Sequence, residues 1–218
     1  MKILEDLCRT ANSFFERGYA FGSTGNLSVR EGEEVWVTPT GKPLCGLTPA
    51  SLAKIDMEGR ALNGASPSKE YPFHLAIYRR RADVSAIVHL HSTYAVALSC
   101  LDEIDESRPL PAITPYFFMR VAPLVVVPYF RPGSGDLAAA VGEAAGRGNT
   151  LLLRNHGLIC VGETWNEAVD RTEEFEETAK LRFLLRGERV RELGEADLEE
   201  LRQAFPPRPI RLRGAPGG

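Results

Sequence analysis

Residues 85–98 read SAIVHLHSTYAVAL, an apolar run that holds two of the four histidines in this 218-residue chain. His89 and His91 alternate with Leu90, and residues two apart in a strand lie on the same face of a sheet. Val88 and Leu90 then point into the opposite layer. The stretch predicts a buried strand that presents two imidazoles on one face near its end and is followed by a helix.

Outward from this strand, helical and strand-like segments alternate along the chain. Apolar spacing and capping signals predict helices at residues 2–17, 70–81, 93–101, 135–146 and 164–187. Strand-like runs occupy residues 21–44, 83–92, 123–130 and 149–162. This order indicates one mixed α/β domain, residues 1–205, with helices on both faces of a sheet. Residues 206–218 are rich in Pro, Gly and Arg and predict a flexible C-terminal tail.

Composition excludes several classes of protein. The net charge is −3, so no basic surface for nucleic acid is expected. Four widely separated cysteines form no Cys-x-x-Cys pair and fit reduced, buried thiols. The N-terminus lacks the apolar core of a signal peptide, and no later run has membrane-spanning length. We therefore expect a cytoplasmic protein without a membrane partner.

A third histidine follows a second apolar run. His156 lies in LLLRNHGLI, residues 151–159, where a strand gives way to a glycine-bearing turn. With His89 and His91 it would complete a three-histidine zinc site with an open position, the arrangement of catalytic zinc. Manganese or cobalt would suit the same ligands. The alternatives are a loop histidine bonded to backbone and a polar strand face near the surface, and His-x-His alone is a weak signal.

Glu70 lies in SPSKEYPFHLAIY, residues 66–78, in the first turn of the helix predicted there. Ser68 and Lys69 precede it, and a helix N-terminus with such neighbours suits a phosphate group. An ordinary serine N-cap with dipole matching by glutamate is the alternative. The turns GSTGN (22–26) and TPTGK (38–42) share small hydroxyls and glycines. Three such segments together suggest a composite anion cradle.

These motifs together resemble the class II aldolase/adducin-head family. The matching pieces, in order, are GSTGNLSVR, VTPTGKPL, PSKEYPFHLAIYRRRADVSAIVHLHSTY, ITPYFF and LLLRNHGLI, and they span most of residues 10–185. The resemblance implies a three-layer α/β/α fold around a central, largely antiparallel (mixed) sheet. It also implies zinc ligands at Glu70, His89, His91 and His156, with Glu70 serving as the catalytic acid/base. The phosphate end of a substrate would meet Gly25, Asn26, Thr40, Gly41, Ser68 and Lys69.

Within that family, the Ser68-Lys69-Glu70 triplet resembles the 3-oxo-tetronate 4-phosphate decarboxylases more than the fuculose-phosphate aldolases, which carry Ser-Ser-Glu. The resemblance implies a phosphorylated four-carbon sugar acid as substrate, and CO2 and dihydroxyacetone phosphate as products. Tyr116 aligns with a family tyrosine that reaches the active site from a neighbouring subunit, and Arg120 is a candidate partner for the substrate carboxylate. A homotetramer with active sites between subunits is implied as well.

Other functions fit part of the same pattern. A class II sugar-phosphate aldolase or a pentulose-phosphate 4-epimerase would use the same metal ligands, because the metal site alone does not separate these reactions. A non-catalytic, adducin-like interaction domain is the alternative outside enzymes. It is disfavoured because all four metal positions are present.

Overall fold

The computed structural model describes residues 2–214. Its helices are α1 (Lys2–Glu16), α2 (Tyr71–Arg80), α3 (Thr93–Ser99), α4 (Pro115–Arg120), α5 (Gly135–Ala145), α6 (Trp165–Leu184) and α7 (Glu195–Ala204). Its strands are β1 (Asn26–Glu31), β2 (Glu34–Val37), β3 (Ala53–Asp56), β4 (Ala86–Leu90), β5 (Leu124–Val127), β6 (Thr150–Leu153) and β7 (Gly157–Gly162). None of the helices in the described part of the chain is both long and apolar enough to cross a membrane.

Within residues 2–214 the strands form one seven-stranded sheet in the order β3-β2-β1-β4-β7-β6-β5. The strand with the two histidines, β4, lies at its centre between β1 and β7 and runs antiparallel to both. The pair β5 and β6 is parallel. The sheet is therefore mixed and largely antiparallel, as expected.

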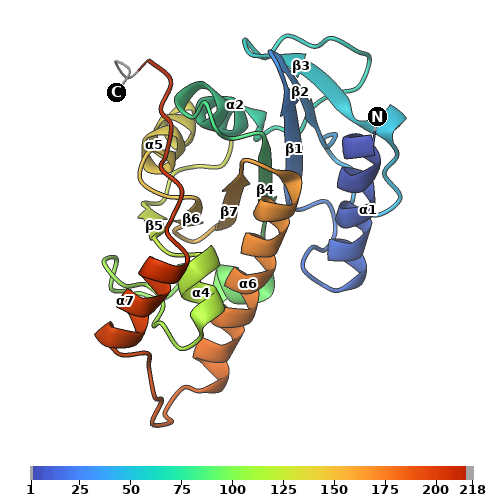
Figure 1. Ribbon diagram of the computed structural model, residues 1–218. Coiled ribbons are helices and arrows are strands. Elements are labelled where there is room, and N and C mark those ends of the chain that lie inside the picture. The colour runs from blue at the N-terminus through green and yellow to red at the C-terminus, as the bar shows by residue number, and fades with distance from the viewer. Residues whose placement is uncertain (1, 215–218) are drawn as a thin grey trace.

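Helices cover both faces of the sheet (Figure 1). On one face α2 and α5 pack over side chains such as Ile87 and Ile159. On the other face α1, α3, α4 and α6 cover side chains such as Val88 and Leu158. Alternate side chains of β4 therefore pack into two separate cores, because successive side chains of a strand point to opposite faces. The three-layer α/β/α prediction is confirmed.

The long helices and the principal strands lie where the sequence predicts them, with ends that differ by a few residues. Three elements were not predicted: β3, α4 and α7. Strand β3 has only four residues, and α4 only six. Helix α7 has no buried residue, although Leu198 packs against the core from a partly buried position. Among the described residues the four cysteines are free, but Cys45 is only partly buried and Cys100 is exposed, contrary to the expectation of buried thiols.

After α7 the chain runs back to the level of α2 (Figure 1). The amide of Ala82 donates to the carbonyl of Arg211 at 2.8 Å, and the amide of Arg213 donates to the carbonyl of Arg80 at 2.9 Å. Arg208 also pairs with Glu167 at 2.8 Å. Residues 206–214 therefore touch the domain at several points, while residues 215–218 lie outside the described part. The division into a domain (1–205) and a flexible tail (206–218) stays a prediction.

Beneath this segment lies a buried ion pair. The guanidinium of Arg81 donates to both carboxylate oxygens of Asp83, at 2.8 and 2.7 Å. Both side chains are almost fully buried, at 2% and 3% exposure. Arg81 also donates to the carbonyl of Ala145 at the end of α5. The pair ties the ends of α2 and α5 to the start of β4.

We expect Asp83→Ala to lower the free energy of unfolding by about 3–5 kcal/mol, because it leaves the Arg81 guanidinium buried without a carboxylate. Urea denaturation measures this loss. As a matched control, Asp6→Ala breaks the pair with Arg9, whose side chain is 76% exposed. It should change the stability by less than about 0.5 kcal/mol. Equal losses in the two variants would contradict the prediction.

Candidate metal centre

The three predicted histidines come together at one end of the central strands. His89 lies near the end of β4, His91 follows that strand, and His156 lies in the turn between β6 and β7. Antiparallel pairing of Leu90 with Leu158 brings this turn beside the end of β4. The ring centroids of the three imidazoles lie 4.8–5.0 Å apart. The strand geometry inferred from the His-x-His spacing is confirmed, since His89 contacts Phe73 of α2 while Val88 packs in the opposite core.

Glu70 completes the cluster from the start of α2. The helix begins one residue later than the sequence predicts, so Glu70 is the N-cap rather than a first-turn residue. Its side chain makes no capping hydrogen bond, and Pro72 in the first turn removes one amide that would need a cap. The carboxylate is thereby free to turn toward the histidines. It lies 3.3 Å from Nε2 of His89 and 3.1 Å from Nε2 of His156.

The four side chains offer lone pairs that could hold a cation between them. One ligand atom from each of Glu70, His89, His91 and His156 lies within 4.8 Å of the others. Four ligands at zinc–nitrogen distance in a tetrahedron would lie about 3.3–3.4 Å apart, close to the shorter separations seen here. Among the described residues, Oε1 of Glu70 and both ring nitrogens of His156 are buried without a hydrogen-bond partner. Such orphaned polar atoms fit a site built for a divalent metal ion.

The protonation states suit metal binding. Nδ1 of His89 lies 2.9 Å from the carbonyl oxygen of Leu158 and donates to it, which leaves the lone pair of Nε2 facing the cluster. Burial, followed by the neighbouring His89 and His156, lowers the pKa of His91 to about 3. Burial alone would raise the pKa of Glu70, but attraction and hydrogen bonds from His89 and His156 outweigh that effect and lower it. An ionised Glu70 and a neutral His91 are forms that bind a cation.

A buried glutamate that the sequence analysis missed fixes the segment after His91. Glu176 of α6 accepts hydrogen bonds from the Ser92 hydroxyl at 2.6 Å, from the Tyr94 amide at 2.8 Å and from the Ala95 amide at 2.9 Å. Its negative charge therefore offsets the partial positive charge at the N-terminus of α3, a helix that starts two residues after His91. The sequence signal that could have identified Glu176 is its position, because this charged residue lies on the same face of α6 as buried residues such as Thr172.

The three segments predicted as an anion cradle lie side by side. Thr38 joins the first two, because its amide donates to the carbonyl of Leu27 at 3.0 Å and its hydroxyl accepts from the Leu27 amide at 3.1 Å. The amide of Ser68 in turn donates to the carbonyl of Thr38 at 3.0 Å. The backbone of the predicted phosphate site is thus assembled next to Glu70. Its members are Gly25, Asn26, Thr40, Gly41, Ser68 and Lys69.

Two predicted site residues lie elsewhere in the chain. Tyr116 is exposed on α4, and the guanidinium of Arg120 lies over its ring. Arg120 also pairs with Asp170 at 3.5 Å, and its carbonyl accepts a hydrogen bond from Arg171. Arg171 donates to the carbonyl of Val161, at the end of β7 remote from His156. Within one chain, the structure therefore does not bring these two residues to the histidine cluster.

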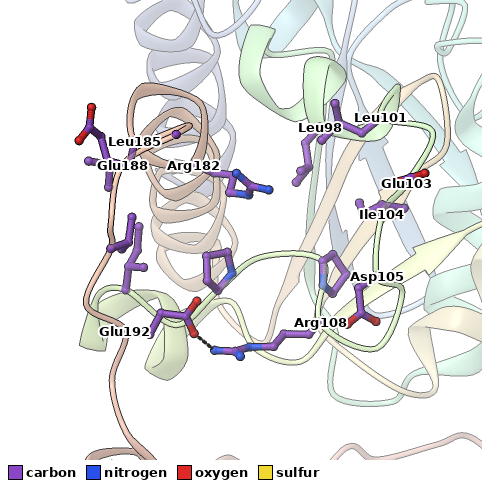
Figure 2. A pocket seen from close by; sticks show the side chains of 15 residues that line it. Leu98, Leu101, Glu103, Ile104, Asp105, Arg108, Arg182, Leu185, Glu188 and Glu192 are labelled. Carbon is purple, nitrogen blue, oxygen red and sulfur yellow. Dashed lines mark hydrogen bonds and ion pairs between the residues drawn. The ribbon is translucent and has the colours of Figure 1, made fainter.

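A pocket of about 480 Å³ opens between α3, the loop after it and the end of α6 (Figure 2). Leucines such as Leu98 line it beside charged residues of both signs, and an ion pair between Arg108 and Glu192 crosses one side. The residues around it include none of the metal ligands or predicted phosphate-binding residues. The chemistry of this protein is therefore assigned to the histidine cluster and not to this pocket.

A mixed sheet with a Glu-His-His-His cluster at the ends of its central strands defines an α/β protein with a site that could hold a metal ion. Residues 5–183 match the family model described as Class II Aldolase and Adducin N-terminal domain, and the chain belongs to this family. A Haemophilus influenzae protein named 3-oxo-tetronate 4-phosphate decarboxylase is 47% identical over 198 residues, which cover 90% of this chain and 94% of that protein.

Two further relatives extend the comparison. The crystal structure of YgbL from Escherichia coli superposes with a TM-score of 0.89 at 44% identity, covering 92% of this chain and 98% of that one. An L-fuculose phosphate aldolase from Methanococcus maripaludis is 35% identical over 182 residues, which cover 84% of this chain and 97% of that protein. Two of the reactions weighed from the sequence, decarboxylation and aldol cleavage, thus appear in the names of these relatives.

Stability of the metal-free protein should depend on pH through its buried histidines. Burial lowers the pKa of His74 to about 3, and that of His91 is also about 3, against 6.5 in the unfolded chain. The unfolded state therefore binds more protons between pH 6.5 and 3, so stability is complete above pH 6.5 and falls as the solution is acidified. The expected loss is up to about 1.4 kcal/mol per pH unit for each histidine. Urea denaturation between pH 7 and 5.5 measures it, and a flat profile would contradict the assignment.

Removal of the buried glutamate gives a second test. Glu176→Ala leaves one hydroxyl and two amides without an acceptor, each at a cost of about 1–3 kcal/mol. We expect the free energy of unfolding to fall by at least about 3 kcal/mol and metal affinity to fall with it. The neighbouring Glu177→Ala, which breaks only an exposed pair with Lys180, serves as control in the same denaturation series. If both variants were equally stable, Glu176 would not have the role assigned to it.

Proposed function

We propose that this chain is a metal-dependent carbon–carbon lyase that decarboxylates a 3-oxo-tetronate 4-phosphate to dihydroxyacetone phosphate and CO2. The observation that carries the metal-dependent lyase is the convergence of Glu70, His89, His91 and His156 on one point. Decarboxylation, among the reactions such a site can perform, is supported by the match to a relative of that name at 47% identity over nearly the whole of both chains.

The metal ligands in this proposal are the four clustered side chains, with zinc as the ion. Zinc fits because three imidazoles and one carboxylate are ligands it prefers, and manganese or cobalt would fit the same set. When bound, such an ion is a Lewis acid that accepts the negative charge developing on the C3 oxygen as CO2 leaves. The three imidazoles are neutral ligands, so only the carboxylate of Glu70 would offset the charge of the ion.

Glu70 is the proposed acid/base. As the bond between C1 and C2 breaks, its electron pair remains on the substrate, and C2 then needs a proton. Glu70 stands at the edge of the predicted phosphate site, and its Oε1 has no hydrogen-bond partner in the described part of the chain. As an ionised carboxylate it would first take up a proton from water on Oε1, and it is the group in the cluster that can pass that proton to C2.

Substrate selection is proposed to rest on charge. The phosphate end would lie among the glycine-bearing turns and Ser68, with the exposed Lys69 adding a cation worth about 1.5–3 kcal/mol as a charge-assisted hydrogen bond. Arg120 and Tyr116 would act from a neighbouring subunit, because within one chain they lie away from the cluster. That arrangement requires the homotetramer proposed for this chain, with active sites between subunits.

The aldolase alternative is favoured by one finding, the 35% identity to an L-fuculose phosphate aldolase. Both reactions leave electrons on the carbon next to the ketone and use the same ligands. They differ in the fragment lost from that carbon, which is CO2 in one reaction and an aldehyde in the other. The product therefore decides between them.

The deciding experiment offers the purified protein 3-oxo-erythronate and 3-oxo-threonate 4-phosphates beside fuculose and ribulose phosphates. We expect CO2 and dihydroxyacetone phosphate from a 3-oxo acid, loss of activity with a chelator, and recovery with zinc. Glu70→Gln should lower the rate about 10²- to 10⁴-fold, because it cannot donate the proton.

Glu177→Gln, on an exposed face of α6, is the matched control and should retain the rate of the unmodified protein. Release of an aldehyde without CO2 would reverse the assignment in favour of an aldolase. A protein that turns over the substrate equally well with Gln at position 70 would remove Glu70 from the mechanism.

A further inference from the structure

A line of hydrogen bonds runs from the core between α2 and β1 to the metal centre. Tyr78 OH lies 2.8 Å from Ser28 Oγ, which lies 2.7 Å from Nδ1 of His74. Nε2 of His74 lies 2.5 Å from Oδ1 of Asn26, and Nδ2 of Asn26 donates to Oε2 of Glu70 at 2.8 Å. Five side chains from α2, β1 and the residue before α2 thus form one continuous chain.

The Glu70 carboxylate, at one end of this series of hydrogen bonds, determines which group donates in each of them. An ionised carboxylate only accepts, so the amide nitrogen of Asn26 must face Glu70 and its oxygen must face His74. His74 must then carry its proton on Nε2 and accept on Nδ1. The Ser28 hydroxyl donates to that Nδ1, and the Tyr78 hydroxyl donates to Ser28. All donors point toward the metal centre.

The hydrogen-bonded side chains are shielded from solvent. Ser28, His74 and Tyr78 are fully buried and Asn26 is 2% exposed. The ring of His74 also stacks on Phe73 at 4.7 Å, which limits its rotation. In a buried network with every member satisfied, each group holds the next in one orientation.

We propose that Tyr78, Ser28, His74 and Asn26 are positioning residues that hold Glu70 by Oε2 and so keep Oε1 as the oxygen free for the metal ion or the proton. The proposal deepens the proposed function and rests on its metal centre. It assigns His74, which is not a ligand, the single tautomer with the proton on Nε2. It also means that the Asn26 amide is engaged with Glu70 in addition to lying in the predicted phosphate site.

A purely structural role is the competing explanation, since any buried polar chain stabilises a core. The two differ in what a break does. A structural chain changes stability alone, whereas a positioning chain also changes how tightly the cluster holds a metal ion. Outer partners of metal ligands typically contribute about 10- to 100-fold in affinity.

The first test needs no substitution. Long-range ¹H–¹⁵N correlation spectra of the metal-free protein distinguish a protonated ring nitrogen from an unprotonated one, and only four histidines need assignment. We expect His74 to be protonated on Nε2 and unprotonated on Nδ1. Protonation on Nδ1 would reverse the direction of the chain and overturn the proposal.

The second test measures zinc affinity by competition with a fluorescent chelator. Ser28→Ala and His74→Phe should weaken zinc binding by about 10- to 100-fold. His74→Gln keeps a donor toward Asn26 and should recover most of the affinity. Thr172→Val, which breaks one buried hydrogen bond on α6, is the matched control and should bind zinc normally even where it loses stability.

The outcomes separate this proposal from the proposed function. Zinc binding that is as tight in Ser28→Ala and His74→Phe as in Thr172→Val would leave the chain a merely structural feature and overturn the proposal. If the unmodified protein bound zinc but released no CO2, the proposed reaction would fail while the positioning role stood. If His74→Phe did not fold, the spectra and Ser28→Ala would still decide.

Discussion

The structure depends on the antiparallel pairing of β1, β4 and β7. This pairing places Asn26 opposite His89 and Leu90 opposite Leu158, so that one end of the sheet carries the histidines and their partners. The register is strict, because a slip of one residue would turn His89 into the opposite core and Val88 toward the metal. Two glycines allow the backbones to meet there. A Cβ on Gly157 would lie 2.5 Å from the carbonyl oxygen of Leu90, and one on Gly25 would lie 2.9 Å from that of His89.

Buried polar groups around the cluster follow one rule, which is that each is held by partners from another element. Glu176 of α6 holds the segment after His91, and Asn26 of β1 holds Glu70. Leu158 of β7 accepts from His89. The exceptions are Oε1 of Glu70 and the two ring nitrogens of His156, and each of these side chains can offer one ligand atom to a cation. Because the other polar groups named here already have partners, the site is largely organised before the ion arrives, and this reduces the reorganisation needed to bind it.

Much of the site was predictable because its signals are local. The two-residue repeat of His89 and His91 places both on one face of a strand by backbone geometry alone. The turn that carries His156 is marked by an apolar run followed by Asn and Gly. The long helices show apolar spacing because each must cover a face of the sheet. The elements β3, α4 and α7 were not predicted; β3 and α4 are short, with four and six residues, and α7 has no buried residue.

By itself, the sequence indicated a mixed α/β domain, the long elements and three candidate histidine ligands, while Glu70 entered as a ligand through the family resemblance. Only the tertiary structure decided which distant groups act together. Asn26 meets Glu70 across 44 residues of sequence, and Ser92 meets Glu176 across 84. The tertiary structure also decided the order of the strands and the start of α2 at Tyr71, which leaves Glu70 outside the helix. These features depend on packing and strand register, which bring together residues far apart in the sequence, and local sequence patterns do not predict such contacts.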